Sequence, residues 1–308
     1  MSTSGVMLVD KPAGITSHDV VSRVRRIAGT RKVGHAGTLD PMATGLLIIG
    51  IDGSTRLLTY LVGLDKQYLA TIRLGWATTT DDADGEPLRP PADTSGVTAD
   101  GIREAIRPLT GRISQIPSAV SAIKVDGRRS YDRVRDGEDV VLAARTVTVS
   151  AFDVLDTRLG SHGVELDVRV DCSSGTYIRA LARDLGATLG VGGHLIALRR
   201  TRVGPFRIED ATPLPERDES GTALLESVLA PASAARRLFP DVILTGGERI
   251  ELQQGKRPRL SALEGALANS PGPIAAIGED GELTGLISAS AGVAKVLVNF
   301  PTDAGGAA

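Results

Sequence analysis

The sequence predicts a globular protein that contains both helices and strands, with a small β-rich module at its C-terminal end. Its 308 residues are enough for one large domain or for a main domain and a small one. Hydrophobic residues make up 42% of the chain and charged residues 23%, which is close to ordinary globular usage. We predict a main domain over residues 1–240 and a C-terminal domain over residues 241–308.

The composition excludes several classes of protein. Lys and Arg number 35 against 37 Asp and Glu, so a net charge of −2 excludes a uniformly basic coat for nucleic acid. The single cysteine, Cys172, excludes an intrachain disulfide and a multi-cysteine metal site, which fits a reducing cytoplasm. No apolar run approaches the roughly 18 residues that cross a bilayer, and no signal-peptide pattern is present. We therefore expect a cytoplasmic protein without a membrane partner.

The N-terminal segment predicts a helix after a short apolar run and a turn. Residues Thr16–Asp19 have the spacing of a capping box. Apolar side chains then recur at helical spacing from Val20 to Ile27. The stretch from Val20 to Leu39 holds five basic residues and no acidic one. A solvated helix face and a surface for a polyanion both fit this charge pattern.

Two segments alternate in the way that strands do. In Gln67–Leu74, Tyr68 shares the more apolar face, and Val164–Cys172 alternates strictly between apolar and charged residues. Residues Ser173–Thr176 then turn the chain into a helix. Its apolar residues are spaced three and four apart between Ile178 and Leu189.

An acidic, turn-rich stretch, Asp81–Gly85, follows the first of these strands, and a loop is predicted over Pro87–Gly101. Its acidic residues raise the possibility of a calcium site. An EF-hand loop, however, needs Glu at its twelfth position, where this chain has Ala92. We therefore predict a turn without a metal.

The C-terminal third begins with a second basic segment, Arg199–Arg207, which contains no acidic residue. Thr212–Glu216 has the composition of a linker, and Ala223–Leu238 has helical character. Short strands are predicted beyond residue 241, including Ile274–Ile277 and Leu283–Ile287 around a Glu-Asp-Gly-Glu turn. The final residues, 304–308, are rich in Gly and Ala, and we expect them to be frayed.

The densest cluster of glycine and reactive side chains is Gly34–Gly45, which includes His35 and Asp40. It lacks the order of a phosphate-binding P-loop. The glycines would let the backbone approach a large ligand, with Asp40 as a reacting carboxylate. An ordinary Asp-Pro turn fits the same spacing, so the residues alone leave both interpretations open.

The segment Gly34–Gly45 resembles the nucleophile motif of the TruB-type tRNA pseudouridine synthases. Four further blocks match that family in the same order: Asp10–Asp19, Lys66–Tyr68, Cys172–Arg179 and Leu198–Thr201. The resemblance implies an α+β fold, in which a mixed, mostly antiparallel sheet carries the active site. The C-terminal piece resembles a small, β-rich PUA-type RNA-binding module.

The resemblance implies that the chain isomerises the T-loop uridine of tRNA, at position 55, to pseudouridine. This reaction neither oxidises nor releases anything, so we expect no cofactor and no metal. Asp40 is the implied nucleophile, because a carboxylate is ionised at neutral pH and retaining glycosidases use the same group. Whether it attacks ribose C1′ or uracil C6 stays open.

The same resemblance implies five residues that bind the substrate around Asp40: His35, Tyr68, Tyr177, Arg179 and Leu198. Arg179 would keep the carboxylate ionised, and Tyr68 would lie against the extruded uracil and assist proton movement at its carbon. Tyr177 and Leu198 would contact the base, and His35 would occupy the space that it leaves. Without the resemblance, each of these residues also fits a role in the core, in a loop or on the surface. Cys172 is expected to be a buried, inert thiol.

The expected partner is the T-arm of tRNA, bound in a salt-sensitive way along the two basic segments, Arg23–Lys32 and Arg199–Arg207. The sequence implies no protein partner, and we expect a monomer. Two alternatives stay open: the catalytic subunit of a guide-RNA-directed pseudouridine synthase, and a non-catalytic tRNA-binding or RNA-folding protein.

Overall fold

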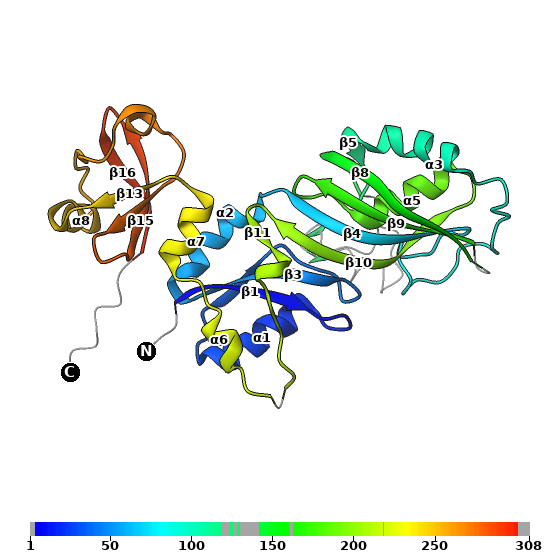
Figure 1. Ribbon diagram of the computed structural model, residues 1–308, viewed down its shortest axis with the longest axis horizontal. Helices are drawn as coiled ribbons and strands as arrows, with labels where there is room; N and C mark the ends of the chain where they lie inside the picture. The colour runs from blue at the N-terminus through cyan, green and yellow to red at the C-terminus, as the bar shows by residue number, and fades with distance from the viewer. Residues whose placement is uncertain are drawn as a thin grey trace. The chain divides into compact units, whose positions relative to one another are not determined.

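Two compact units make up the chain in the computed structural model, which describes residues 4–118, 124–125, 128–129, 142–160, 163–217 and 219–300 (Figure 1). One unit comprises Met1–Leu39, Leu47–Val62 and Gly204–Ala308. The other comprises Asp40–Leu46 and Gly63–Val203. No helix in the described ranges has the length and apolar character needed to cross a membrane.

The second unit is built on a mostly antiparallel sheet in the order β3-β10-β4-β9-β8-β5, in which only the β3–β10 pair is parallel. Its strands are β3 (Thr44–Ile51, of which the first residues belong to this unit), β4 (Lys66–Leu74), β5 (Gly111–Gln115), β8 (Arg145–Gly160), β9 (Gly163–Cys172) and β10 (Gly193–Val203). Its helices are α3 (Ala99–Ile106) and α5 (Ile178–Thr188), and α5 packs on β10. The short strands β6 (Lys124–Val125) and β7 (Arg128–Arg129) pair with each other.

The alternation in the sequence decides which side of this sheet is buried. Residues of β4 alternate between buried and partly exposed positions, with Tyr68 on the buried side, and β9 alternates in the same way. Both predicted strands are therefore confirmed. The helix that follows β9 is also confirmed, and its buried residues face the sheet.

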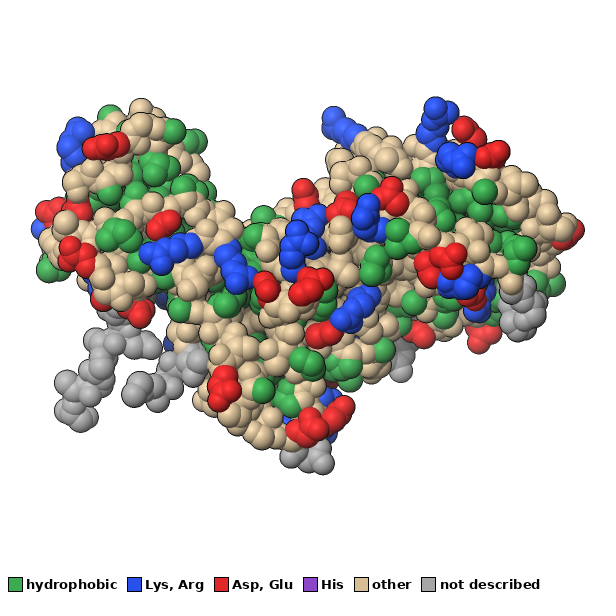
Figure 2. Space-filling view, in the orientation of Figure 1, with side chains coloured by type: hydrophobic (Ala, Val, Ile, Leu, Met, Phe, Trp, Pro, Cys, Tyr) green, Lys and Arg blue, Asp and Glu red, His purple; other side chains and the backbone are tan. Residues whose placement is uncertain are grey.

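The opposite side of this sheet carries charged residues that pair across strands. Acidic and basic side chains lie next to each other over β4, β9 and β10 in Figure 2. The pairs with distances of 2.5–2.8 Å are Arg73–Glu165, Arg169–Asp153 and Arg202–Asp171. Cross-strand ion pairs therefore neutralise much of the charge on this face.

The first unit contains β1 (Gly5–Lys11), α1 (Ser17–Ala28), β2 (Val33–Ala36), the rest of β3, α2 (Leu58–Val62) and β12 (Thr212–Pro213). The predicted capping box is confirmed, because the Thr16 hydroxyl accepts from the Asp19 backbone and the Asp19 carboxylate accepts from the Thr16 backbone. The linker predicted over Thr212–Glu216 is wrong at its start, because β12 adds to β1 as a parallel strand. Such a short edge strand tolerates Pro213, since its N–H is not required.

The helix predicted over Ala223–Leu238 is two helices, α6 (Thr222–Glu226) and α7 (Pro231–Leu238). Pro231 begins α7, and the preceding Ala230 has an extended backbone with ψ of 146°. Proline disfavours helical geometry in the residue before it, so one continuous helix cannot form there.

The C-terminal residues form a four-stranded sheet in the order β13-β14-β15-β16. The strands are β13 (Asp241–Leu244), β14 (Ile274–Gly278), β15 (Leu283–Ser290) and β16 (Val293–Asn299), which confirms both strands predicted in this region. The sequence analysis missed α8 (Gly246–Gln253), which a capping box of Thr245 and Glu248 begins. The boundary at residue 240 stays a prediction, and the tail from Ala304 lies outside the described residues.

Candidate active site

Asp40 lies in the middle of the loop that leads from β2 (Val33–Ala36) into β3 (Thr44–Ile51). The preceding residue, Leu39, is fixed to α1 because the Ser17 hydroxyl accepts from its N–H and donates to its carbonyl, at 2.9 and 3.1 Å. Beyond Asp40, its carbonyl accepts from the Ala43 N–H at 3.1 Å and closes a turn. The Asp40 side chain is about one-third exposed (35%), so a substrate can reach it.

A glycine allows the strand that follows Asp40 to lie against β10. Gly45 has a φ of +99°, and a Cβ at this position would lie 2.3 Å from the carbonyl oxygen of Arg200. A side chain would therefore be strained and would also clash with backbone. The start of β3, directly after the loop that contains Asp40, can therefore pack closely on β10 only because residue 45 is glycine.

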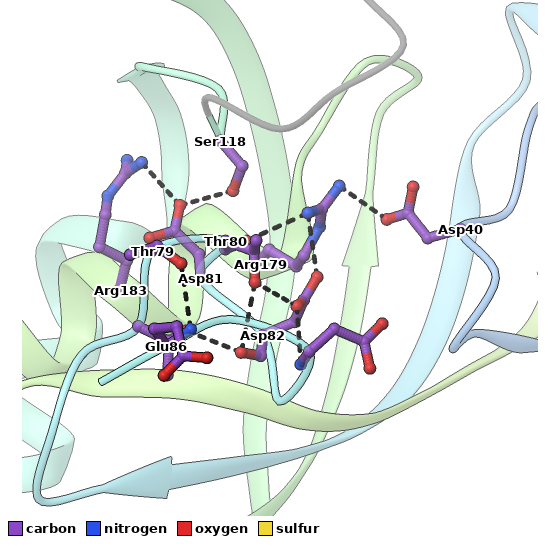
Figure 3. A network of polar contacts seen from close by, with 11 residues as sticks. Asp40, Thr79, Thr80, Asp81, Asp82, Glu86, Ser118, Arg179 and Arg183 are labelled. Atoms are coloured by element: carbon purple, nitrogen blue, oxygen red, sulfur yellow. Dashed lines mark hydrogen bonds and ion pairs between the residues drawn. The ribbon is translucent and has the colours of Figure 1, made fainter. Parts of the chain in front are cut away.

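Arg179, in the first turn of α5, joins Asp40 to a second carboxylate. Its Nη2 lies 2.9 Å from Asp40 Oδ2, and its Nη1 lies 3.0 Å from Asp82 Oδ2. The same Nη1 donates to the Thr80 carbonyl at 3.1 Å. Figure 3 shows the guanidinium between Asp40 on one side and Asp82 with Thr80 on the other. Arg179 is only 5% exposed, and such a buried charge requires partners of this kind.

The turn that holds Arg179 is itself fixed by short-range hydrogen bonds. The Asp82 carbonyl accepts from the Thr78 hydroxyl at 2.7 Å, and the Asp82 carboxylate accepts from Thr80 and from the Asp84 N–H. These contacts leave Asp82 with one orientation, in which its other oxygen faces Arg179. The result is a preorganised carboxylate behind the guanidinium.

The adjacent Asp81 makes a second, parallel attachment to α5. It accepts from the Ser118 hydroxyl and lies 3.1 Å from Arg183 Nη1, one helical turn after Arg179 (Figure 3). Burial raises the pKa of Asp81, and the contacts with Ser118 and Arg183 act in the opposite direction. The two aspartates thus fix the turn to the helix at two points.

The sequence analysis missed this function of Asp81 and Asp82, because it treated them as part of a turn. Their partners on α5 are about a hundred positions away in the sequence, for example 97 between Asp82 and Arg179. A pair of acids directly after a strand was the only local signal, and turns commonly contain aspartate.

The segment between β4 and this turn contains the protein's single tryptophan, Trp76. Its carbonyl pairs with His194 Nδ1 at 3.0 Å, and the two rings lie 5.1 Å apart. The Arg73 guanidinium lies 5.6 Å from the Trp76 ring. Burial lowers the pKa of His194, which favours the neutral imidazole in this position.

Tyr68 and Leu198 lie on the buried side of the sheet, on neighbouring strands, and are 7% and 8% exposed. Burial raises the pKa of Tyr68. The negative charge of Asp40 raises it further, so the two side chains interact electrostatically. Tyr177 precedes α5, where its N–H donates to the Gln115 side chain at 2.8 Å. Tyr68 therefore lies close enough to Asp40 to be affected by its charge, and Leu198 is on the same side of the neighbouring strand.

The remaining predicted residues have the following places. His35 belongs to β2 in the first unit, where its ring makes an edge contact with His18 at 5.7 Å. Cys172 is 2% exposed, and burial raises the pKa of its thiol to about 11. Among the described residues, no group of three or more His, Cys, Asp or Glu is arranged to hold a metal ion.

The basic segment Arg199–Arg207 is not uniformly available to RNA, which corrects the expectation for two of its members. Arg200 is 1% exposed, and its Nε donates to the Leu46 carbonyl at 2.8 Å. Arg202 pairs with Asp171 at 2.7 Å. A hydrogen bond to the backbone and an ion pair within the sheet therefore compete with phosphate for these two side chains. The side chain of Arg207 is exposed, as are those of Arg25, Arg26, Arg31 and Lys32 in the first segment.

Two family models match the sequence. Residues 25–178 match the TruB family pseudouridylate synthase N-terminal domain, and residues 179–235 match the tRNA pseudouridylate synthase B C-terminal domain. A curated protein from Leifsonia xyli subsp. xyli, named tRNA pseudouridine synthase B, is 57% identical over 306 residues and covers 98% of both chains. A protein of the same name from an Arthrobacter species is 54% identical, with 97% of this chain and 98% of that protein covered.

The fold is similar to that of a solved structure described as a Cbf5-Nop10-Gar1 complex. The TM-score is 0.69 at 26% sequence identity, and the match covers 97% of this chain and 84% of the other.

Proposed function

Because the chain belongs to the TruB family of pseudouridylate synthases, we propose that it isomerises uridine 55 in the T-loop of tRNA to pseudouridine. The observation that carries this proposal is the ion pair between Asp40 and the buried Arg179. A partly exposed carboxylate beside a fixed guanidinium is suited to covalent attack on a nucleoside. Two relatives that are 57% and 54% identical to this chain are named tRNA pseudouridine synthase B.

The reaction requires one nucleophile and two proton movements, one from C5 and one to N1. Asp40 forms a covalent adduct, the C–N glycosidic bond breaks, and the uracil rotates before its C5 bonds to the ribose. C5 then loses a proton, N1 gains one, and the carboxylate is released unchanged. The balance involves no oxidation, so no step calls for a redox cofactor.

Arg179 and Asp82 prepare Asp40 for this step. The guanidinium charge favours the ionised carboxylate, and its planar geometry restricts the directions from which the carboxylate can attack. Asp82 prevents Arg179 from turning away. In this proposal Arg179 contacts the nucleophile, and Asp82 is a positioning residue that acts through it.

The buried side of the sheet supplies a site for an extruded base. Extruding a stacked uridine costs a few kcal/mol, and stacking on an aromatic side chain offsets roughly 1–3 kcal/mol of it. Tyr68 is the stacking partner in this proposal, and Tyr177 and Leu198 contact the same base. His35 occupies the space in the RNA that the base leaves.

The expected partner is the T-arm of tRNA, and the exposed basic residues between Arg25 and Lys32 would contact its phosphates. The C-terminal sheet, as a PUA-like module over residues 241–308, would extend that surface. We propose a cytoplasmic monomer that needs no protein partner.

The test is incubation of the purified protein with an unmodified tRNA transcript, followed by mapping of pseudouridine. We expect modification at position 55 of the wild-type transcript and none of a transcript that carries cytidine there. Asp40→Asn should bind the transcript with unchanged affinity and form no product. Modification by the purified chain alone excludes a guide-RNA-directed subunit. If the wild-type protein forms no pseudouridine and Asp40→Asn binds and folds tRNA as well as the wild type does, the result would instead support an RNA-folding protein.

A further inference from the structure

Among the described residues, Arg200 is the largest side chain that is fully buried, with 1% exposure, and the proposed reaction leaves it without a function. It lies on β10, the strand between β3 and β4. Its register partners are Gly45 on β3 and Tyr68 on β4. Arg200 therefore stands between the strand that begins after the nucleophile and the strand that carries the base-stacking tyrosine.

The Arg200 side chain makes contacts in both directions. Its Nε donates to the Leu46 carbonyl on β3 at 2.8 Å. The guanidinium is also hydrogen-bonded to the phenol of Tyr68 on β4. Directly opposed residues of antiparallel strands share a face, so Arg200 and Tyr68 lie on the same buried side as Leu198. A planar guanidinium with several donors can hold both acceptors at once.

We propose that Arg200 is a positioning residue that holds the Tyr68 oxygen to accept the proton leaving C5 in the last step of the isomerisation. This inference rests on the proposed function. In that step the C5–H bond breaks, and its electron pair restores the C5–C6 double bond of the base. The Tyr68 oxygen takes this proton while its own hydroxyl proton passes to a water molecule, and that water gives a proton to N1, so the phenol and the water end the step unchanged.

The charges around Tyr68 explain why it needs this neighbour. Burial raises the pKa of Tyr68, as do the charges of Asp40 and Cys172, and each of these effects disfavours the ionised phenol. Arg200 acts in the opposite direction through its charge and its hydrogen bond. Lys66 lies on the same face of β4, and burial together with the charge of Arg200 lowers its pKa to about 8.

Two variants separate the charge of Arg200 from its hydrogen bonds, and a third serves as the control. Arg200→Gln keeps donors and removes the charge, and Arg200→Lys keeps the charge but cannot reach both acceptors. Arg169→Gln is the control, because Arg169 is a partly exposed arginine of β9 paired with Asp153. Each protein is first checked for folding by circular dichroism and for its affinity for tRNA.

The first measurement does not depend on activity. Tyrosine labelled with ¹³C at Cζ is titrated by NMR, with Tyr68→Phe assigning the Tyr68 signal among the four tyrosines. We expect Arg200→Gln to raise the Tyr68 titration midpoint by about one pH unit or more, the size typical of losing an adjacent opposite charge. Arg169→Gln should leave the midpoint unchanged. An unchanged midpoint in Arg200→Gln would overturn the inference even if the chain had no activity on tRNA.

The second measurement follows the proton itself, with tRNA deuterated at C5 of the target uridine. We expect Arg200→Gln to lower kcat by about 10²-fold with little change in KM, and to increase the deuterium isotope effect as proton removal becomes limiting. Arg200→Lys should show a smaller decrease in kcat than Arg200→Gln, together with a raised isotope effect. If Arg200→Gln does not fold, the Arg200→Lys result tests the inference by itself. Activity on tRNA with a wild-type isotope effect in Arg200→Lys would refute the inference and leave the proposed function intact.

Discussion

Asp82 Oδ2 lies 3.0 Å from Nη1 of Arg179, on the side of the guanidinium that faces away from Asp40. The two carboxylates therefore share one buried cation. Asp82 is itself buried, whereas Asp40 is partly open to solvent. The buried carboxylate has no access to substrate and can only fix the arginine, while the open one can react.

This arrangement predicts the effect of Asp82→Asn. The amide removes the charge that orients Arg179, so kcat should fall by about 10- to 10²-fold while the affinity for tRNA is unchanged. Single-turnover pseudouridine formation measures the rate. Asp84→Asn is the matched control, since Asp84 is exposed in the same turn and should keep wild-type activity. Equal rates for the two variants would contradict a positioning role for Asp82.

Arg179→Ala is expected to change the pH dependence of the reaction. Without the guanidinium, the pKa of Asp40 should rise, because the ionised carboxylate loses its adjacent positive charge. The rising, acidic limb of the rate profile should therefore move to higher pH, with a greater loss of rate at pH 6 than at pH 8. Single-turnover rates across this range test the prediction, and a profile that is uniformly lower at all pH values would refute it.

The parts of this protein that could be predicted from its sequence depend on local patterns. The Thr16–Asp19 capping box and the alternation in Val164–Cys172 involve residues close together, and the structure confirms both elements. Arg200 shows the opposite case. It stands in a basic run that is typical of an RNA-binding surface, yet β-strand pairing places it in the core.

The candidate site shows the same limit. The resemblance to a known family suggested Asp40 and Arg179, and they lie in contact. Asp82 could not be found in this way, because only the return of the chain through α5 brings Arg179 to it. Long-range pairing of this kind leaves no periodic signal in the sequence. The short strand β12 was missed for a related reason, since its partner is β1 at the other end of the unit.

Lys66 should make stability depend on pH in the alkaline range. It is 6% exposed, and burial lowers its pKa from 10.5 to about 8. Between these values the unfolded chain binds more protons than the folded one, so the free energy of unfolding should rise with pH. Relative to Lys66→Met, the gain from pH 8 to pH 10.5 should reach about 3 kcal/mol, since one pKa unit is worth about 1.4 kcal/mol. Urea unfolding of both proteins at several pH values provides the comparison, and parallel curves would contradict it.

Cys172 should be unreactive in the native protein. Its thiol is buried and has a pKa of about 11, so little thiolate exists at pH 8. Reaction with a chromogenic disulfide should be at least about 10²-fold slower in the folded protein than in guanidinium chloride. Because Cys172 is the only cysteine, Cys172→Ser gives the blank. Equal rates in both conditions would show that the thiol is open to solvent.

The single indole of the chain is placed to report on the site optically. Trp76 leads into the turn that holds Arg179 and contacts the ring of His194. Emission excited at the red edge of protein absorption therefore comes from one position only. Any rearrangement of that segment when RNA is added changes the colour or intensity of this emission, so the unmodified protein carries its own spectroscopic probe.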